Sequence, residues 1–231
     1  MANAVPTISK GKPAIAVLLV DDHPILRRGI ADLINSEPDL KVCGEAGTMQ
    51  EALAAMTQFK PRLVVVDVSL DGNNGIELMK TLSTRWATTP LLAYSMHDET
   101  IYAERALRAG AKGYVMKQTP PETLLTAVRQ VLKGKIFLSD QMSDRLLGKL
   151  IGAGTTSAAV TSPVERLSDR ELEVFEMLGK GLSTAQIADK LCLSVKTIET
   201  YREHLKQKLS LGSGPELLRY AIEWSLEKTR Q

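Results

Sequence analysis

Short apolar runs alternate with amphipathic segments through the first half of the chain. Five runs predict strands between residues 14 and 137: AVLLV, LKVCGEA, LVVVDV, LLAYS and KGYVM. The segments between and after them carry apolar residues at helical spacing and predict helices, at Ile25–Ile34, Met49–Phe59, Gly75–Leu82, Glu99–Ala109 and Pro121–Leu132. Strands that alternate with helices are typical of βαβ units. We therefore expect an α/β domain with a five-stranded parallel sheet that helices cover on both faces.

The second half of the chain has a helical pattern only. After Phe137 we expect one polar helix, SDQMSDRLLGKL, and then a flexible linker, GAGTTSAAVTSP, which is rich in small residues and has no periodicity. From residue 166 onward, helix starts are marked by three N-cap serines and a proline: Ser168 with Glu171, Ser183 with Gln186, Ser194, and Pro215. Gly181 is placed to end the first of these helices in a left-handed conformation. This segment predicts an all-α four-helix domain.

The length of 231 residues suits two domains, since one domain usually has roughly 100–200 residues. We predict a flexible N-terminal tail (1–13), the α/β domain (14–137), an interdomain linker with a helical first part (138–163) and the helical domain (164–231). The apolar run at 14–20 ends in Asp21-Asp22 without a small-residue cleavage site, which favours a buried strand over a signal peptide. Because no long apolar span occurs, we expect a cytoplasmic protein that does not enter a membrane.

Charge and cysteine content add little about partners. The net charge is only +2, and the excess basic residues, Lys10 and Lys12, lie in the N-terminal tail. A nucleic-acid function must therefore rest on the local placement of charge. Cys43 and Cys192 lie in apolar runs far apart in the sequence, and we expect both to be reduced core residues.

Three aspartates follow strand candidates. Asp21 and Asp22 come after the first strand and Asp67 ends the third. In a flavodoxin-like sheet of order 2-1-3-4-5, the strand order reverses between these two strands, and ligands bind at their carboxyl ends. Because clustered carboxylates repel one another, the site needs a cation, and Mg²⁺ suits oxygen ligands. We expect Asp22 and Asp67 to bind Mg²⁺, with Asp21 in the outer shell and the backbone carbonyl of Ser69 as a third protein ligand.

The fourth and fifth strands add groups that suit a phosphoryl group. Ser95 offers a hydroxyl and Lys117 a compact positive charge. A carboxylate can attack a phosphoryl group to form an aspartyl phosphate, so Asp67 is the predicted phosphoacceptor, assisted by Lys117 and Ser95. Singly, each residue has an ordinary structural explanation, such as a helix cap for an aspartate or a solvated surface charge for a lysine. Their occurrence on successive strand ends favours one joint site.

These residues, together with Tyr114 on the last strand, resemble the receiver domain of bacterial response regulators. The resemblance covers the whole predicted α/β domain. It implies that a sensor histidine kinase supplies the phosphoryl group, and that Ser95 and Tyr114 are switch residues that alter the surface of the fourth helix, fifth strand and fifth helix. One departure is Asp71, because the loop after the phosphoacceptor usually reads LPG and here reads LDG.

The helix expected after Ser194 has two different faces. At 100° per residue, Ile198, Leu205 and Leu209 form an apolar stripe that we expect to face the core. The other face and its flanks carry the predicted DNA-binding residues, which are Lys196, Glu199, Thr200, Arg202, Glu203, Lys206 and Lys208. The basic side chains suit phosphate contacts, and the glutamates and the threonine suit base edges. The periodicity alone is equally consistent with a helix that packs into a bundle without net charge and binds another protein.

The segments LSDRELEVFEMLGKG, QIADKL and SVKTIETYREHLKQKL are similar to the LuxR-type helix-turn-helix of NarL/FixJ-class regulators. This resemblance implies a transcription regulator, not a metabolic enzyme, that binds a double-stranded DNA operator and forms a homodimer on phosphorylation. Ala185 stands where a lysine is usual in that family, which removes one phosphate contact.

Two alternatives remain open from the sequence. One is a Mg²⁺-dependent phosphohydrolase that uses the same pocket, which is disfavoured because Ser69, not an acid, stands two residues after Asp67. The other is a transcription factor whose α/β domain serves as a docking platform regardless of phosphorylation.

Overall fold

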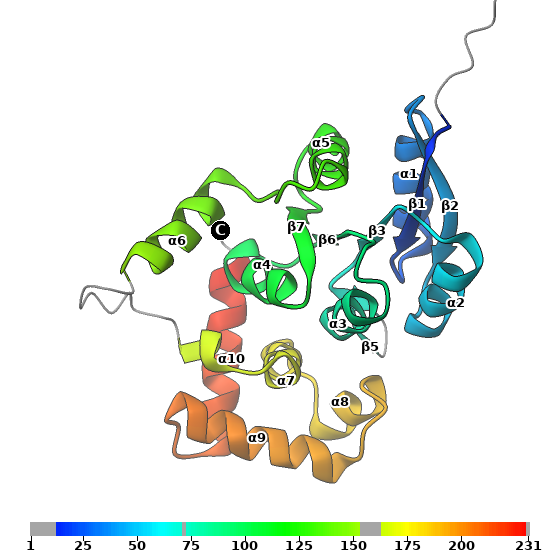
Figure 1. The fold of residues 1–231 in the computed structure, drawn as a ribbon. Helices are drawn as coiled ribbons and strands as arrows, with labels where there is room; N and C mark the ends of the chain where they lie inside the picture. Colours follow the sequence, from blue (N-terminus) through cyan, green and yellow to red (C-terminus); the bar gives the residue numbers. More distant parts are fainter. Residues whose placement is uncertain (1–12, 71–72, 153–162, 230–231) are drawn as a thin grey trace, which may run out of the picture.

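The computed structural model describes residues 13–70, 73–152 and 163–229, and its α/β part and helical part pack side by side (Figure 1). The α/β part consists of β1 (Ile15–Val20), α1 (Pro24–Asn35), β2 (Leu40–Ala46), α2 (Met49–Phe59), β3 (Leu63–Val66), β4 (Ser69–Leu70), β5 (Asn73–Asn74), α3 (Gly75–Arg85), β6 (Leu91–Ser95), α4 (Glu99–Arg108), β7 (Ala111–Met116) and α5 (Pro121–Leu132). The remaining elements are α6 (Asp140–Gly152), the 3-10 helix η1 (Pro163–Arg166), α7 (Asp169–Gly179), α8 (Thr184–Lys190), α9 (Val195–Leu209) and α10 (Gly214–Thr229).

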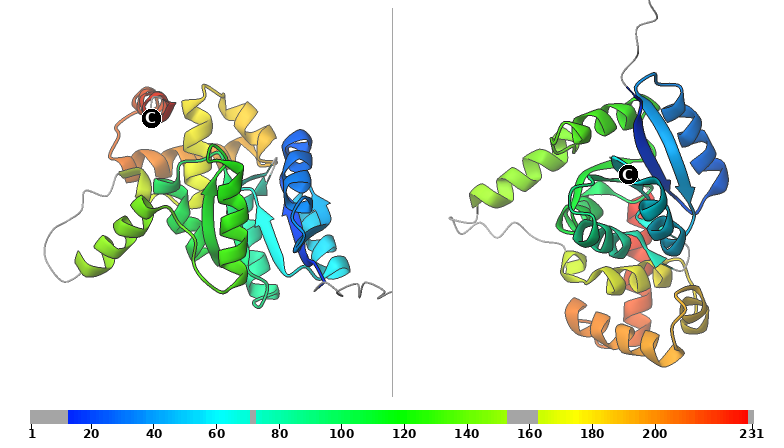
Figure 2. Two further views of the ribbon diagram at one scale, coloured as in Figure 1. Left: turned by 90° about the horizontal axis from the view of Figure 1, so that it is seen from above. Right: turned by 45° about the vertical axis from the view of Figure 1, so that its right-hand side comes forward.

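The main sheet has the order β2-β1-β3-β6-β7, and every neighbouring pair in it is parallel. Successive strand residues point to opposite faces, so Val17 and Leu19 pack with α1 and α5, whereas Leu18 and Val20 pack with α2, α3 and α4. Figure 2 shows these helices on both sides of the sheet. The predicted fold class and the reversal of strand order between β1 and β3 are confirmed.

The N-cap residues expected in the helical part are all present. The side chain of Ser168 accepts from the backbone N–H of Glu171, and the Glu171 carboxylate accepts from the N–H of Ser168. Ser183 and Gln186 form a second capping box, and Ser194 caps α9. These caps satisfy backbone donors that a helix start otherwise leaves unpaired. As predicted, Gly181 is left-handed, with φ +79°.

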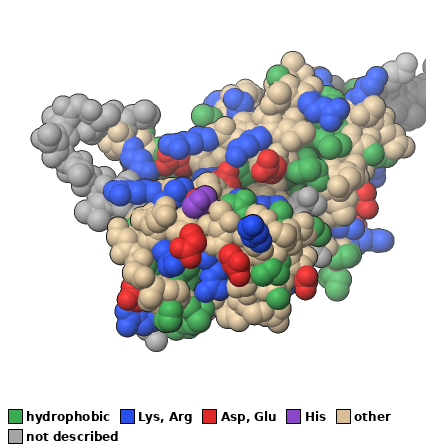
Figure 3. All heavy atoms as spheres, turned by 90° about the horizontal axis from the view of Figure 1, so that it is seen from below, with side chains coloured by type: hydrophobic (Ala, Val, Ile, Leu, Met, Phe, Trp, Pro, Cys, Tyr) green, Lys and Arg blue, Asp and Glu red, His purple; other side chains and the backbone are tan. Residues whose placement is uncertain are grey.

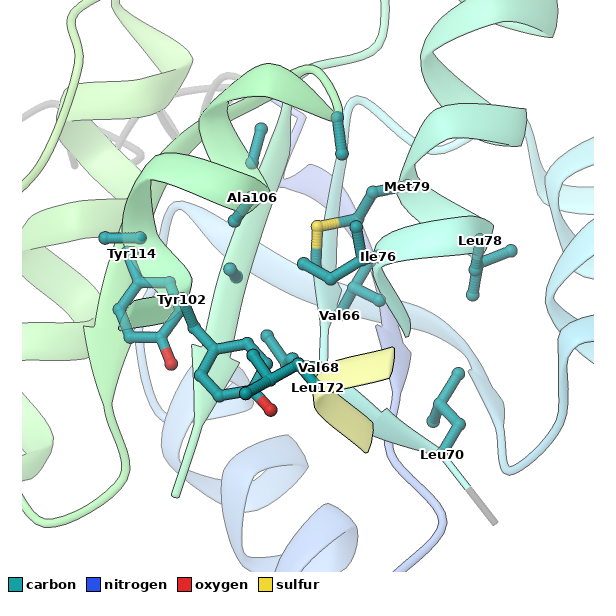
Figure 4. Packing of buried hydrophobic residues seen from close by; sticks show 14 of the residues in the cluster. Val66, Val68, Leu70, Ile76, Leu78, Met79, Tyr102, Ala106, Tyr114 and Leu172 are labelled. Carbon is teal, nitrogen blue, oxygen red and sulfur yellow. The ribbon is translucent and has the colours of Figure 1, made fainter. Parts of the chain in front are cut away.

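The helical part has its own apolar centre on α7. Phe175 is fully buried there, with its ring 5.8 Å from the ring of Tyr220 and 5.3 Å from that of Trp224 on α10. The same hydrophobic cluster continues across α7 into the α/β part, where it includes Tyr102 and Val68 beside Leu172 (Figure 4). The two parts therefore share apolar packing in this arrangement.

Ion pairs accompany this packing between the two parts. Asp169, at the start of α7, accepts from Lys80 of α3 at 2.7 Å and from Arg105 of α4 at 2.9 Å. Burial opposes ionisation of Asp169, but the two cations outweigh it and lower its pKa below the usual value. Arg105 also reaches the carbonyl oxygen of Glu165 at 3.3 Å. The start of α7 is thus tied to two helices of the α/β part.

The structure differs from the sequence-based prediction at two places. A small antiparallel hairpin, β4–β5, follows Asp67 where only a loop was expected. Cys192 is exposed and lies at φ +52° in the turn before α9, so its placement in the core was wrong. A tight turn at this point carries the side chain out of the apolar run. Cys43 is half-buried, and both cysteines are free.

Several predicted segments fall outside the described residues. They are the tail 1–12, the linker segment 153–162 and Asp71. The polar helix expected before the linker segment is present as α6. Among the described residues, none of the helices combines the length and the apolarity that a membrane crossing requires.

Candidate functional site

Asp21 and Asp67 lie side by side at the carboxyl edge of the sheet. They directly follow β1 and β3, which pair in register with Val20 opposite Val66. The backbone N–H of Asp67 donates to the carbonyl of Val20 at 2.8 Å, which continues the pairing by one residue. Both aspartates are buried. Two neighbouring parallel strands that end together therefore place two carboxylates in one pocket.

A buried lysine joins these carboxylates. Lys117 follows β7, and its backbone N–H donates to the carbonyl of Ser95 at the end of β6. Its Nζ donates to Asp67 Oδ2 at 2.6 Å and to Asp21 Oδ2 at 2.7 Å, and its side chain is only 2% exposed. The structure thus brings together residues that are 96 positions apart in the sequence.

Burial and neighbouring charges have opposite effects on the pKa values of Asp67 and Lys117, which form a triad with Asp21. Burial raises the pKa of Asp67 to about 6, although the neighbouring Lys117 ammonium favours its ionised form. Burial also disfavours the charged form of Lys117, but the two carboxylates outweigh it and raise the lysine pKa above its usual value. At neutral pH, Asp67 is therefore mainly a carboxylate that can act as a nucleophile.

Asp21 and Asp67 also belong to a group of four residues whose potential metal-ligand atoms converge. One potential ligand atom from each of Asp21, Asp22, His23 and Asp67 lies within 4.8 Å of the others. The N–H of His23 donates to Asp21 Oδ1 at 2.8 Å, and its ring Nδ1 lies 2.8 Å from Asp22 Oδ1. The three carboxylates form a set that suits a hard divalent cation such as Mg²⁺. His23 was not expected here, because a single histidine gives no spacing signal.

The hairpin after β3 places Ser69 at the same site. The backbone N–H of Ser69 donates to Asp67 Oδ1 at 3.1 Å, which fixes the loop against the carboxylate. Gly75, which starts α3, packs so closely that a Cβ there would lie 1.9 Å from the carbonyl oxygen of Asp67. Only glycine fits this position without a shift of the backbone.

Ser95 and Tyr114 meet at the backbone of His97. Ser95 Oγ accepts from the His97 N–H at 3.1 Å, and the Tyr114 hydroxyl donates to the His97 carbonyl at 2.8 Å. Ser95 and Tyr114 are both buried. Burial raises the pKa of Tyr114, so its hydroxyl stays protonated and remains a donor. The two predicted switch residues thus hold the same loop between β6 and α4.

His97 extends this network to the helical part. Its Nε2 is hydrogen-bonded to the hydroxyl of Ser69, and its ring lies 4.4 Å from the ring of Tyr102. Its Nδ1 lies 3.6 Å from a carboxylate oxygen of Glu176 on α7. The sequence gives no signal for this position of His97 between the pocket and α7, because it depends on domain packing that periodicity does not reveal.

The predicted DNA-binding residues lie on the outward side of α9. Ile198, Leu205 and Leu209 are buried as expected, so the rest of the helix faces away from the core. The side chains of Lys196, Glu199, Thr200, Glu203 and Lys208 are exposed, and those of Arg202 and Lys206 are partly exposed. In Figures 1 and 2, α7 lies between α9 and the α/β part. In Figure 3, which views the α9 side, basic and acidic side chains are interspersed.

Three of these side chains have partners on the protein. Arg202 donates to the Thr184 hydroxyl of α8 at 2.7 Å, and Lys208 donates to Glu171 of α7 at 2.6 Å. Lys206 lies 2.8 Å from Glu203 of the same helix. These contacts orient the basic side chains. The two salt bridges are partly exposed to solvent, so Lys206 and Lys208 can exchange their glutamate partners for a phosphate at little cost in free energy.

Comparison with known proteins divides the chain in the same way. Residues 17–129 match the family described as "Response regulator receiver domain". Residues 165–221 match "Bacterial regulatory proteins, luxR family". The chain is 34% identical to the oxygen regulatory protein NreC of Staphylococcus carnosus over 212 residues, which are 91% of this chain and 98% of NreC.

Two solved structures of RcsB are similar in fold. RcsB from Salmonella enterica serovar Typhimurium, bound to promoter P1flhDC in the presence of phosphomimetic BeF3-, is 25% identical with a TM-score of 0.63, over 90% of this chain and 98% of that chain. A structure of two RcsB dimers bound to two parallel DNAs is 26% identical with a TM-score of 0.54, over 90% of this chain and 97% of that chain.

Proposed function

Because the chain belongs to the response regulators that join a receiver domain to a LuxR-type DNA-binding domain, we propose that Asp67 accepts a phosphoryl group that controls DNA binding by α9. The family consists of transcription regulators and not of metabolic enzymes. The observation that carries the proposal is the buried contact of Lys117 with Asp67 at 2.6 Å, beside a second carboxylate on the next strand.

In the proposed reaction, an Asp67 carboxylate oxygen attacks the phosphorus of a histidine phosphate on a sensor kinase. A new oxygen–phosphorus bond forms, the phosphorus–nitrogen bond to the histidine breaks, and the product is an acyl phosphate on Asp67. Lys117 supplies positive charge to the phosphoryl oxygens, and the Ser95 hydroxyl offers them a hydrogen bond. Because Lys117 donates hydrogen bonds to both Asp21 and Asp67, its buried ammonium is already desolvated and oriented toward the site of the phosphoryl group.

The residues at the carboxyl edge fit Mg²⁺. The converging carboxylates of Asp21, Asp22 and Asp67 supply hard oxygen donors, and the Ser69 carbonyl is the proposed backbone ligand. When bound, Mg²⁺ would neutralise charge on the phosphoryl oxygens. In its absence, Lys117 is the cation that keeps Asp21 and Asp67 together.

The proposed switch passes through the loop after β6. Once its hydroxyl turns to the phosphoryl group, Ser95 no longer accepts from the N–H of His97. Tyr114 holds the same residue through its carbonyl, so the loop and the start of α4 move together with these two side chains. Because α4 contacts α7 through Arg105 and Asp169, this movement reaches the DNA-binding domain.

We propose that α9 enters the major groove as the second helix of a helix-turn-helix. Lys196, Arg202, Lys206 and Lys208 would contact phosphates, and Glu199, Thr200 and Glu203 would face base edges. The promoter-bound RcsB structure supports DNA as the partner, and the DNA-bound RcsB dimers support our proposal that the chain binds as a homodimer.

The test is phosphorylation of the full chain by acetyl phosphate with Mg²⁺, followed by intact mass spectrometry. We expect one added phosphoryl group on the wild type and none on Asp67→Asn. Equal labelling of the two proteins would exclude Asp67 as the acceptor. DNA binding of the labelled and unlabelled protein then separates phosphate-controlled regulation from a receiver that acts only as a docking platform.

A further inference from the structure

A second cavity lies at the amino edge of the receiver's sheet, at the opposite end of β3 and β6 from Asp67 and Ser95. It has a volume of about 610 Å³, and its lining comes from the end of α2, the α2–β3 loop and the α3–β6 loop. All of these segments belong to the receiver, so this amino-edge cavity does not depend on how the two domains pack. Its volume is in the range of sites for small organic molecules.

Part of the lining of the amino-edge cavity is apolar. Met56 is 1% exposed and Pro61 is buried, whereas the half-buried side chain of Trp86 packs against the main hydrophobic cluster. The guanidinium of Arg85 lies 5.1 Å from the centre of the Trp86 ring system, within the range of a cation–π contact. The tryptophan therefore offers the cavity a flat apolar surface on which an aromatic ring can pack.

The same cavity is positively charged. Lys60 and Arg62 line it, both are exposed, and the exposed Arg85 lies beside it. Among the described residues, none of these three cations is paired with a carboxylate, and none of the lining residues is acidic. The acidic residues of α2 and α3 are Glu51 and Glu77, each in the first turn of its helix. At a rise of 1.5 Å per residue, each is roughly 13 Å from the cavity end of its helix.

The ends of α2 and α3 reduce this positive charge without cancelling it. A helix C-terminus carries roughly half a negative charge, so the two ends together oppose the three cations with about one charge. Some of the terminal carbonyls also have partners. The backbone N–H of Lys60 donates to Met56 at 3.2 Å, and that of Trp86 donates to Leu82 at 2.8 Å. An anion in the amino-edge cavity therefore still meets a net positive charge.

Two threonines add hydroxyl donors to the lining. Thr88 is exposed and Thr89 is half-buried, and both line the cavity. The backbone N–H of Thr89 donates to the carbonyl of Trp86 at 2.9 Å, which holds the loop in a turn beside the indole. Hydroxyl groups next to cations suit the oxygens of a carboxylate, sulfonate or phosphate.

We propose that the amino-edge cavity is a binding site for a small organic anion with a flat aromatic body. The aromatic body packs on Trp86 and covers Met56 and Pro61, and the anionic group lies between Lys60 and Arg62. Burial of apolar surface supplies affinity, and the two cations select for negative charge. The site is separate from the phosphorylation pocket, and binding there does not require phosphorylation of Asp67.

A fluorescent anion, anilinonaphthalene sulfonate, tests the site on the full chain. We expect it to bind with a Kd of about 10–100 µM, as is usual for a ligand of this size in an open cavity. Lys60→Gln combined with Arg62→Gln should weaken this binding roughly five- to twentyfold and should change the binding of uncharged phenylnaphthylamine by less than about twofold. The matched control is Arg28→Gln with Lys133→Gln, which removes the same charge at exposed positions on α1 and after α5 and should keep wild-type affinity.

Nuclear magnetic resonance locates the bound probe. The chain has two tryptophans, so its indole N–H groups give two signals, which the variant Trp86→Phe assigns. We expect the Trp86 signal to shift on titration with anilinonaphthalene sulfonate. The Trp224 signal should stay in place, because Trp224 lines a different cavity.

Three results would overturn the proposal. The first is a wild type that does not bind the probe, and the second is a shift of the Trp224 signal alone. The third is equal affinity in the wild type and in the Lys60→Gln, Arg62→Gln variant, because the two cations would then serve only the helix ends. Arg62→Gln by itself, for which we expect a loss of roughly two- to fivefold, keeps the charge test available if the double variant does not fold.

Discussion

The phosphorylation pocket and the outward face of α9 are built in opposite ways. In the pocket, buried groups from three strand ends meet, and Lys117 and Asp21 are 96 positions apart. On α9, the polar side chains lie within one helix of 15 residues, and most of them are exposed. The reaction proposed for the pocket needs charged groups in a low dielectric, and only the fold brings such buried groups together. Contact with DNA needs only exposed side chains on one face of a helix. A change in the pocket should therefore affect stability and function together, and a change on the outward face of α9 should affect function alone.

Replacement of the buried lysine should have the largest effect. In Lys117→Met, Asp21 and Asp67 lose their shared cation inside the protein, so we expect the free energy of unfolding without Mg²⁺ to fall by about 3–5 kcal/mol. Phosphorylation should be lost as well. Chemical denaturation followed by circular dichroism measures the first effect. Lys112→Met, at an exposed position on β7, the strand that Lys117 follows, should change stability little. Similar losses in the two variants would contradict the buried triad.

The inner side of α9 should behave like the pocket. Ile198 is fully buried, and Ile198→Ala should lower the free energy of unfolding by about 2–5 kcal/mol through lost burial and a cavity. DNA affinity should fall with it, because the helix is no longer held in place. The neighbouring exposed variant, Glu199→Ala, should stay within about 0.5 kcal/mol of the wild type in the same denaturation experiment. A small effect of Ile198→Ala would show that α9 is not held by this stripe.

The raised pKa of Asp67 predicts that the stability of the protein depends on pH. In the folded protein its pKa is about 6 against an ordinary 3.8, so the folded state binds more protons between these values. As pH rises from about 4 to about 6, the free energy of unfolding should therefore fall, by up to about 3 kcal/mol for this group alone. The free energy of unfolding is measured by chemical denaturation at several pH values with a chelator present. The difference between the wild type and Asp67→Asn gives the contribution of Asp67. A difference that grows in the opposite direction would mean that Lys117 outweighs burial.

An exposed lysine of α9 should show the smallest effect on stability. Lys196→Ala should shift the free energy of unfolding by less than about 0.5 kcal/mol. If Lys196 contacts a phosphate, the slope of log affinity against log salt should fall by about one, nearly equally for all DNA sequences. Fluorescence anisotropy at several salt concentrations measures the slope, with Lys112→Ala on the receiver as the control. An unchanged slope would remove Lys196 from the interface.

The sequence predicted the features that depend on local chemistry. Ser168, Ser183 and Ser194 were recognised as helix starts because their side chains replace missing backbone donors. The strand ends of Asp67 and Lys117 were found because parallel strands give apolar runs with an abrupt polar end. Such signals are contained in a few consecutive residues and need no knowledge of the tertiary structure.

Features that depend on packing were missed. The strands β4 and β5 consist of serine, leucine and two asparagines, a composition equally typical of a loop. The positions of His97 and Glu176 result from the docking of two domains, which no periodicity encodes. Cys192 lies in an apolar run, but a left-handed turn directs it to solvent.

The position of α9 has a kinetic consequence. In the docked arrangement its outward face is already uncovered, because α7 and not α9 lies against the receiver (Figures 1 and 2). Encounter with DNA depends on an accessible charged surface, so an unmodified molecule can sample genomic DNA without first opening. If two copies bind adjacent half-sites, as proposed, selectivity for an operator then depends on the dissociation step, because the paired copies stay bound longer.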